Sequence, residues 1–575
     1  MLIADEPMGE IVRNKKYDQD LIHFHDFLSN ERIRKNVTQA NLCRGLCSIS
    51  MMARIESGER LPDKLLRDRF LGRLGVAREG YEDYLQPGEY VLWERKQKII
   101  YDYEHEMWEQ AGNEVAELFK AAEKGNQVCR QFCLLMKAVL LQRKGGDRRE
   151  AAGYLERAGE LTMPEVRFGN LHDYVLSAQE IYILIKLLAY KELTAETGEV
   201  GKAKSNEIDI EKAYIELLDY VWESFLDDIE KVKVYSLIVV QYDSWYQAVT
   251  TIYKRYDVEA EMTSDLYLYK DTETYCISTV IHDRRMMLGY SIAELAEDIC
   301  SEKTLRRIES GKENAQMPIV LEIFERLGLS GEYTKAEVIA YDYATEILVD
   351  KLAHEMNECE YDCAMQDLDE LEKILPHNKA NEQFCKCHRN NLQYRLKYLN
   401  EEKYQKNMLT VIGLSVPFNK IQVKDCFFLT TQESICIYNI ANKINNVDQN
   451  KYVEILRKMK IEKEYLKDIH MLLYELIMTW MASNAGNQGR YGYSDQISNE
   501  TIYMCLHMKR INMIAKNLFN NIWNYLEKNG ENAEKSRIVV ELKCCIAFSQ
   551  IWRDCAFEKF CNERLKMFND GLLHL

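Results

Sequence analysis

Cysteine and histidine are the side chains most able to do chemistry in this 575-residue chain, which has 17 of the first and 11 of the second. Close pairs such as Cys385 and Cys387 lack a second ligand pair at zinc spacing. His354 has no second histidine four residues later, as a zinc-protease helix needs. The residues from Gly486 to Gly492 lack the Lys-Ser/Thr ending of a phosphate-binding loop. We therefore expect no enzyme activity, no metal and no cofactor.

Basic side chains offer another kind of chemistry, the binding of phosphates. The whole chain is acidic, with a net charge of −17, which argues against nucleic-acid binding. The charge is uneven, however, because the stretch from Arg32 to Arg73 holds ten Lys and Arg against four Asp and Glu. This basic stretch could therefore contact a phosphate backbone.

Start and stop signals in the basic stretch predict two short helices joined by a turn. Thr38 is a good N-cap for a helix over 39–43, and Ser48 is one for a helix over 49–56. A glycine follows each helix closely and would end it. Crossed in this way, the helices would share a small core of four apolar residues: Leu42, Leu46, Met52 and Ile55.

The same pattern recurs 253 positions later without a gap. The run from Arg307 to Gly311 repeats the run from Arg54 to Gly58 in type and spacing, and Arg285 repeats Arg32. An internal repeat of this length predicts a duplicated architecture.

This stretch resembles the Cro/repressor-like (XRE) helix-turn-helix family. The residues that carry the resemblance are Arg32, Thr38, Gln39, Leu42, Ser48, the run from Arg54 to Gly58, and Pro62. The Gly-Leu-Cys-Ser turn before the second helix is similar to that of the Rgg-type peptide-pheromone-responsive regulators of Gram-positive bacteria. The resemblance implies a transcription regulator whose second helix enters the major groove of double-stranded DNA.

By the same resemblance, Arg54 would bind guanine through paired hydrogen bonds, beside Ile49 and Ser50 on the outer face. Met51 could pack on a thymine methyl or on its own protein. The expected DNA-binding residues are Gln39, Ser48, Ile49, Ser50, Met51, Arg54, Arg60 and Lys64. Weaker contacts are expected from the second copy at Ser301, Lys303, Arg306 and Arg307. The structural ion pairs of the family would be Arg32 with Glu56 and Arg285 with Glu309.

The two copies are expected to be unequal. From Arg284 to Arg326 there are seven Lys and Arg against eight Asp and Glu, so the second copy is not basic. Ile49 of the first copy corresponds to Glu302 of the second, a carboxylate facing the phosphates. We therefore predict that the first copy carries most of the DNA binding. The alternative is that the second copy reads a different half-site through Glu302 and Arg307.

The remainder of the chain has few helix breakers, with only 7 prolines and 26 glycines. The residues from Ala151 to Pro164 resemble part of a tetratricopeptide repeat, and Asp362 to Pro376 occupy the equivalent place in the second half. We predict an all-α fold of two helix-turn-helix domains, each followed by a tetratricopeptide-like array. The predicted segments are an arm (1–19), a helix-turn-helix domain (20–84), an array (89–257), a linker (258–275), a degenerate helix-turn-helix domain (276–332) and a second array (333–575).

Partners and location follow from these expectations. No run of 18 apolar residues suggests a membrane span, and no secretory signal precedes Lys16, so we expect a cytoplasmic protein with reduced thiols. Double-stranded DNA is the expected partner, with a short signalling peptide of basic character to suit the acidic arrays. Because one chain carries two motifs, it could be a covalent pseudo-dimer, or it could pair with a second copy through the C-terminal helices; we favour the homodimer. The alternative is a helical protein-interaction scaffold whose helix-turn-helix units no longer bind DNA.

Overall fold

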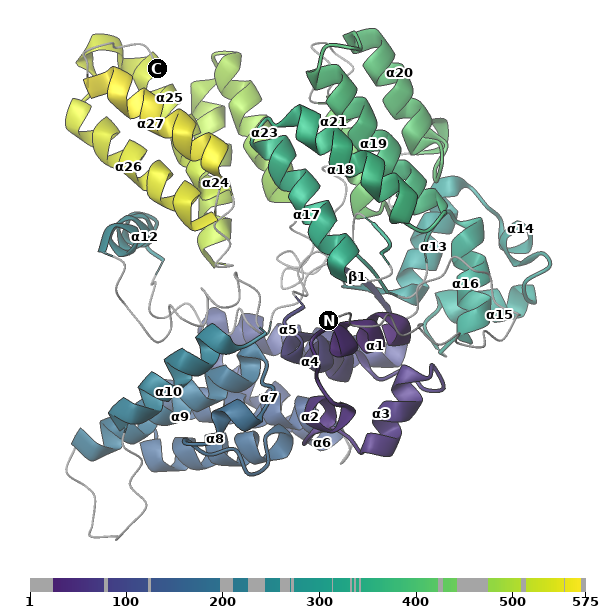
Figure 1. Ribbon diagram of the computed structural model, residues 1–575, viewed down its shortest axis with the longest axis vertical. Coiled ribbons are helices and arrows are strands. Elements are labelled where there is room, and N and C mark those ends of the chain that lie inside the picture. The colour runs from purple at the N-terminus through teal and green to yellow at the C-terminus, as the bar shows by residue number, and fades with distance from the viewer. Residues whose placement is uncertain are drawn as a thin grey trace, which may run out of the picture.

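A computed structural model of the chain shows a mostly helical protein (Figure 1). It describes residues 24–76, 81–122, 126–196, 210–225, 243–258, 269, 274–312, 314–330, 333–335, 338–340, 343–421, 428–441, 474–507, 513–552 and 554–569. The predicted N-terminal arm and most of the predicted linker lie outside these residues.

Four helices form the first helix-turn-helix unit: α1 (Phe24–Arg34), α2 (Gln39–Cys43), α3 (Ile49–Glu56) and α4 (Lys64–Arg73). The predicted bounds of α2 and α3 are confirmed. The Thr38 hydroxyl accepts from the Asn41 amide and the Ser48 hydroxyl from the Met51 amide, each at 3.1 Å, so both caps form as predicted. The four apolar residues predicted to be shared between the helices are all buried.

The second unit repeats this arrangement with α13 (Ile277–Leu288), α14 (Ile292–Ala296), α15 (Glu302–Glu309) and α16 (Met317–Arg326). Ser291 and Glu294 cap α14 reciprocally, and Ser301 caps α15. Both units therefore start their short helices with the same local chemistry.

An ion pair ties the first helix of each unit to the third. Arg32 Nε and Nη2 donate to the two Glu56 carboxylate oxygens at 2.5 and 2.7 Å. Arg285 donates to Glu309 in the same way at 2.6 and 3.0 Å. The hydrogen bond from Glu56 raises the pKa of Arg32, with burial acting in the opposite direction.

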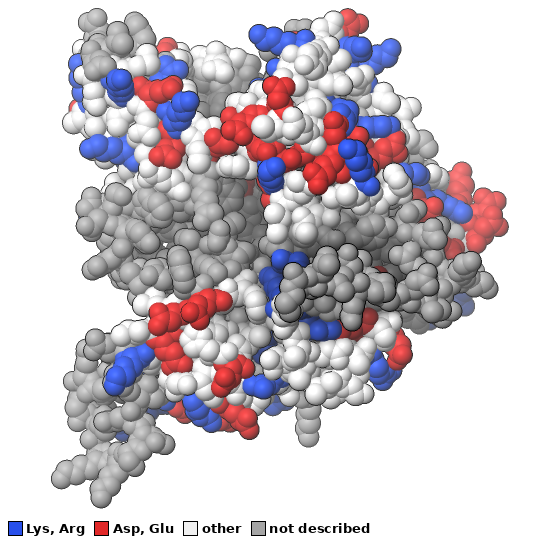
Figure 2. Space-filling view, in the orientation of Figure 1, with Lys and Arg blue, Asp and Glu red and all other residues white. Residues whose placement is uncertain are grey.

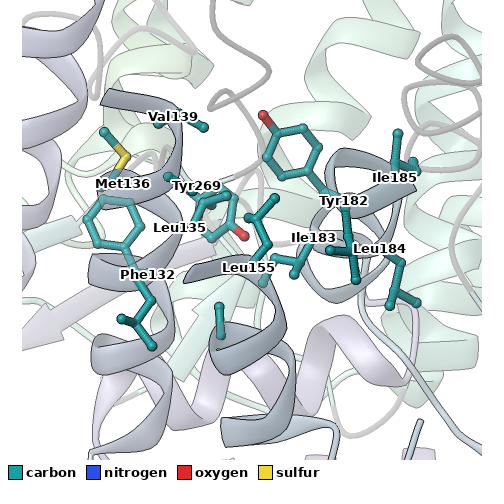
Figure 3. Close-up of a cluster of buried hydrophobic side chains, with 14 of the residues drawn as sticks. Phe132, Leu135, Met136, Val139, Leu155, Tyr182, Ile183, Leu184, Ile185 and Tyr269 are labelled. Carbon is teal, nitrogen blue, oxygen red and sulfur yellow. The ribbon is translucent and has the colours of Figure 1, made fainter. Parts of the chain in front are cut away.

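The first helical array comprises α5 (Pro87–Glu104), α6 (Trp108–Ala121), α7 (Gln127–Arg143), α8 (Arg148–Thr162), α9 (Ala178–Glu196) and α10 (Ile210–Glu223). Side chains of α7, α8 and α9 meet in its core, among them Phe132, Leu155 and Tyr182 (Figure 3). The chain turns between α5 and α6, where Glu106 has a positive φ of 60°. α12 (Asp243–Arg255) follows in the sequence but packs in the core of the second array.

The second array comprises α17 (Tyr343–Asn357), α18 (Tyr361–Ile374), α19 (Lys379–Arg395), α20 (Glu401–Ile412), α21 (Thr431–Ala441), α23 (Tyr474–Asn487), α24 (Tyr491–His507), α25 (Ile514–Asn529), α26 (Lys535–Trp552) and α27 (Cys555–Asn569). Successive helices pack as hairpins, as in tetratricopeptide-like folds. Among the helices that the structure describes, none has the length and apolar character needed to cross a membrane.

A small sheet, absent from the all-α prediction, joins the two halves. Its strands are β1 (Tyr81–Leu85), β2 (Thr274–Cys276) and β3 (Tyr333–Lys335), in the order β2-β1-β3. β1 pairs parallel to β2 and antiparallel to β3. The strands are short and separated by long stretches of sequence, so no local alternation of apolar and polar residues predicts them.

A buried carboxylate connects the first helix-turn-helix unit to its array. Glu180, at the start of α9, accepts from Arg73 Nε and Nη2 of α4 at 3.1 and 2.7 Å. Arg69 Nη1 lies 3.1 Å from the same carboxylate. Thr162 donates to Glu180 at 2.8 Å, and Gln131 donates to Thr162 at 2.6 Å. This network ties α4 to α7, α8 and α9.

An equivalent network lies in the second half. Glu433, 253 positions after Glu180, accepts two hydrogen bonds of 2.6 Å from Arg284. Ser415 donates to Glu433 at 2.5 Å, and Gln383 donates to Ser415 at 3.0 Å. The arginine comes from α13 here, whereas the arginines of the first half come from α4.

Replacing Glu180 with glutamine should destabilise the first half at neutral pH by about 3–5 kcal/mol, because two buried guanidinium groups lose their counter-charge. Burial would raise the pKa of Glu180, but Arg73 and Arg69 outweigh it and hold the pKa at about 2, below the ordinary 4.5. The stabilisation is therefore present above pH 4.5 and is lost as the pH falls toward 2. As the pH falls from 4.5 to 2, the free energy of unfolding should therefore decrease less for the Glu180→Gln variant than for the unchanged chain. Urea unfolding at several pH values measures both.

The matched control is Glu117→Gln, whose carboxylate is exposed and pairs with the exposed Lys120. This substitution should leave urea unfolding unchanged. Equal stability of the Glu180→Gln and Glu117→Gln variants would contradict the role given to the buried network.

Replacing Glu56 with alanine should lower the free energy of unfolding by about 1.5–3 kcal/mol, since Arg32 loses both of its charged hydrogen bonds. Thermal unfolding measures the change. Glu59→Ala is the control, because Glu59 is exposed and lies 3.4 Å from an exposed Arg54. Unchanged stability of Glu56→Ala would show that the pair does not hold the helices together.

Candidate nucleic-acid interface

The outer face of α3 carries the side chains expected to read bases. Ile49 is 56% exposed, and Ser50 is also exposed. The Arg54 side chain is 57% exposed and lies 3.4 Å from Glu59, with which it forms a surface ion pair. Such a pair is weak and can exchange for another partner. The three side chains therefore share one accessible helical face.

The N-terminus of α3 and its surroundings supply polar groups. Ser48 is exposed although its hydroxyl already caps the helix, and Arg60 is exposed just beyond the helix. Gln39 is half-buried, and its amide donates to Glu56 at 2.7 Å. In this structure Gln39 thus supports the ion pair of the unit, and its expected phosphate contact stays a prediction.

The expected contact of Lys64 needs correction, and the structure bears on the alternatives for Met51. Lys64 is 5% exposed, and its Nζ lies 3.1 Å from Asp83 and 3.3 Å from Asp68, so it cannot reach a phosphate from this position. The two carboxylates stabilise the buried ammonium group of Lys64, which would be costly to bury unpaired. Met51 is half-buried against the core of the first unit, which favours the alternative that it packs on its own protein.

The outer face of α15 is exposed at Ser301, Lys303, Arg306 and Arg307. Arg306 Nη2 donates to Glu302 at 2.8 Å, one helical turn away. Glu302, which corresponds to Ile49 of the first unit, thus places a negative charge on this face and forms an ion pair with Arg306. The second surface is accessible but differs in charge from the first.

Two thiols lie together where α2 ends and the turn to α3 follows: Cys43 is the last residue of α2, and Cys47 is in the turn. A hydrogen bond from Cys47 lowers the pKa of Cys43 to about 7, although burial acts against this. Gly45, in the same turn, has a positive φ of 73°, and a β-carbon there would clash with the carbonyl oxygen of Thr162 at 2.2 Å. The turn therefore packs closely on the end of α8.

Sequence reasoning missed the residues that connect these surfaces to the arrays. Glu180 and Glu433 stand 253 positions apart, the offset of the repeat, so extending the self-comparison would have found them. Gln86 gave no such signal: its side chain both donates to and accepts from the backbone of Ala315 at 3.0 Å. Only the tertiary structure brings these two residues together.

Comparison with known proteins agrees with the geometry of the second unit. Residues 281–333 match the sequence profile of the helix-turn-helix family HTH_3. A search of curated proteins gave no significant match.

Two solved structures are similar over about half of this chain. PlcR from Bacillus thuringiensis in complex with the peptide PapR7 and DNA is 18% identical, with 50% of this chain and 98% of PlcR covered and a TM-score of 0.32. ComR from S. thermophilus in complex with DNA and its signalling peptide ComS is 14% identical, with 51% and 99% covered and a TM-score of 0.31. The profile match shows that residues 281–333 are similar to the helix-turn-helix segments of the HTH_3 family.

Proposed function

We propose that the chain is a sequence-specific DNA-binding transcription regulator in which α3 does most of the base reading. The observation that carries this proposal is the exposed face of Ile49, Ser50 and Arg54 on a capped helix. The Arg32–Glu56 ion pair fixes that helix behind the face. A helix presented in this way suits insertion into the major groove, with Arg54 aimed at guanine.

The second unit has the same build but an auxiliary role. Glu302 and its bond to Arg306 make the face of α15 less attractive to phosphates than that of α3. The two units and their arrays are, in this proposal, copies of one ancestral half. The matching networks around Glu180 and Glu433 support the duplication, since their acidic residues keep the offset of the repeat.

The arrays would sense a signal, for which we propose a short peptide with basic residues. Acidic side chains gather over α17 and α18 (Figure 2). The exposed ones include Asp350, Asp362 and Glu370, beside Asp369 and Glu372, which pair with Arg389. A surface of this charge attracts cationic ligands at low ionic strength.

Purified protein should gain thermal stability when titrated with short peptides that contain several Lys or Arg. Binding to the folded state alone raises the melting temperature. The controls are peptides of the same length and apolar content with Glu in place of the basic residues. No shift with either set, in low salt, would contradict basic-peptide sensing while leaving DNA binding untouched.

Replacing Arg54 with alanine should weaken specific DNA binding by about 1–3 kcal/mol, the value of a good base contact. Replacing Arg307, its counterpart in α15, should weaken binding by less. Both variants are measured by fluorescence anisotropy on a duplex selected from a random-sequence pool by the unchanged chain. A larger loss for Arg307→Ala would overturn the proposed inequality.

The same titrations separate a regulator from a scaffold. For a DNA-binding protein the affinity falls steeply as salt is raised, because counterions are released from the phosphates. Arg148→Ala, an exposed arginine in the first array, is the matched control and should bind as the unchanged chain does. Selection that recovers no duplex would favour the scaffold.

A further inference from the structure

The first unit is fixed to β1 by buried ion pairs. Arg67 Nη2 donates to Asp83 of β1 at 2.9 and 3.1 Å, and Lys64 Nζ lies 3.1 Å from the same carboxylate. All three residues are less than one-tenth exposed. Burial would raise the pKa of Asp83, but the two cations lower it, so the carboxylate stays charged. α4 and β1 therefore form one rigid piece.

The second unit is attached to the same strand at both of its ends. β2 leads directly into α13, β3 follows α16, and both strands pair with β1. Gln86, one residue after β1, holds Ala315 at the start of α16 through two hydrogen bonds of 3.0 Å. The ring of Tyr84 packs against Phe324 of α16 with centroids 5.0 Å apart. β1 is thus the common support of both helix-turn-helix units.

Helix α12 belongs to the first half of the sequence but packs in the second half of the fold. It lies against α26 of the second array (Figure 1). Ile252 and Tyr253 are buried there in one core with residues of α24, α25 and α26. The Tyr253 hydroxyl donates to the Leu506 carbonyl at 3.1 Å, and Arg255 lies 3.4 Å from Glu541. Helix α12, from the first half of the sequence, is therefore part of the core of the second array.

The two reading faces are exposed, and they differ. α3 and α15 both lie on the right-hand side of the molecule in Figure 1. α3 presents Ile49, Ser50 and Arg54, whereas the corresponding positions of α15 are Glu302, Lys303 and Arg307. In a symmetric dimer two identical faces read a palindrome. Two different faces held by one chain would read two different half-sites.

We propose that a single chain, as a monomer, binds one duplex that carries two non-identical half-sites at a single fixed spacing. This inference rests on the proposed DNA binding and differs from the homodimer expected from the family resemblance. In a dimeric repressor the partner subunit supplies the second reading helix, whereas here the other half of the same chain supplies it. β1 sets the distance between the reading helices, so the DNA spacing is a property of the fold.

The test uses duplexes selected by the full chain from a random-sequence pool longer than two helical turns. Light scattering should give a mass near 67.6 kDa for the free protein and one chain per duplex in the complex. Arg54→Ala and Arg307→Ala should each weaken binding, the first by roughly tenfold. A mixture of the two variants should bind no better than the stronger variant alone, because no chain in it carries two intact faces.

A dimer in which each chain supplies one face would behave differently. Mixing the variants would then restore tight binding through heterodimers, and two chains would be found per duplex; either result overturns the inference while the proposed function stands. Failure to select any duplex overturns both. Arg148→Ala is the control for mixing. When it is mixed with either variant, the concentration of tightly binding chains should equal the concentration of the Arg148→Ala chain.

Spacing provides an independent readout. Insertion of about 5 bp between the selected half-sites turns them onto opposite faces of the duplex. Affinity should then fall to that of a duplex with the first half-site alone. Unchanged affinity would show that the halves move freely and would overturn the fixed spacing.

Discussion

The structure depends on a carboxylate buried where each helix-turn-helix unit meets its array. Glu180 and Glu433 are fully buried, and a charge in that position is tolerable only when it is paired and hydrogen-bonded. Arg73 and Arg69 satisfy the first, and Arg284 the second. Because the arginines belong to the helix-turn-helix units and the glutamates to the arrays, neither part can shift without exposing an unpaired charge to an apolar interior.

This constraint reaches further than the pairs themselves. Thr162 and Gln131 extend the first network to α8 and α7, and Ser415 and Gln383 extend the second to the end of α20 and to α19. In the proposed function, a signal bound by an array would reach the helix-turn-helix unit through these polar contacts. Gly45 adds a steric contact at this boundary, since only a residue without a side chain fits against Thr162.

The sheet and the buried networks hold different parts of the structure together. The networks attach each unit to its own array, whereas β1 attaches the two units to each other. Lys64 and Arg67 show how a basic sequence can be misread on this point. They contribute to the positive charge of the first unit, but both are buried and paired with Asp83, so their charge is not available at the surface. The exposed positive charge of this unit rests on fewer groups, Arg54 and Arg60 among them.

The sequence by itself determined the local features of this protein. Hydroxyl caps at Thr38 and Ser48, the apolar positions between them and the repeat offset are short-range or self-similar signals, and they predicted α2 and α3 residue by residue. The tertiary structure alone decided which basic residues are free to act, because Lys64 lies one turn from Asp68 but meets Asp83 only after folding. It also decided the sheet and the Gln86–Ala315 contact. Their partners are separated by long stretches of chain, and pairing over such distances leaves no local pattern in the sequence.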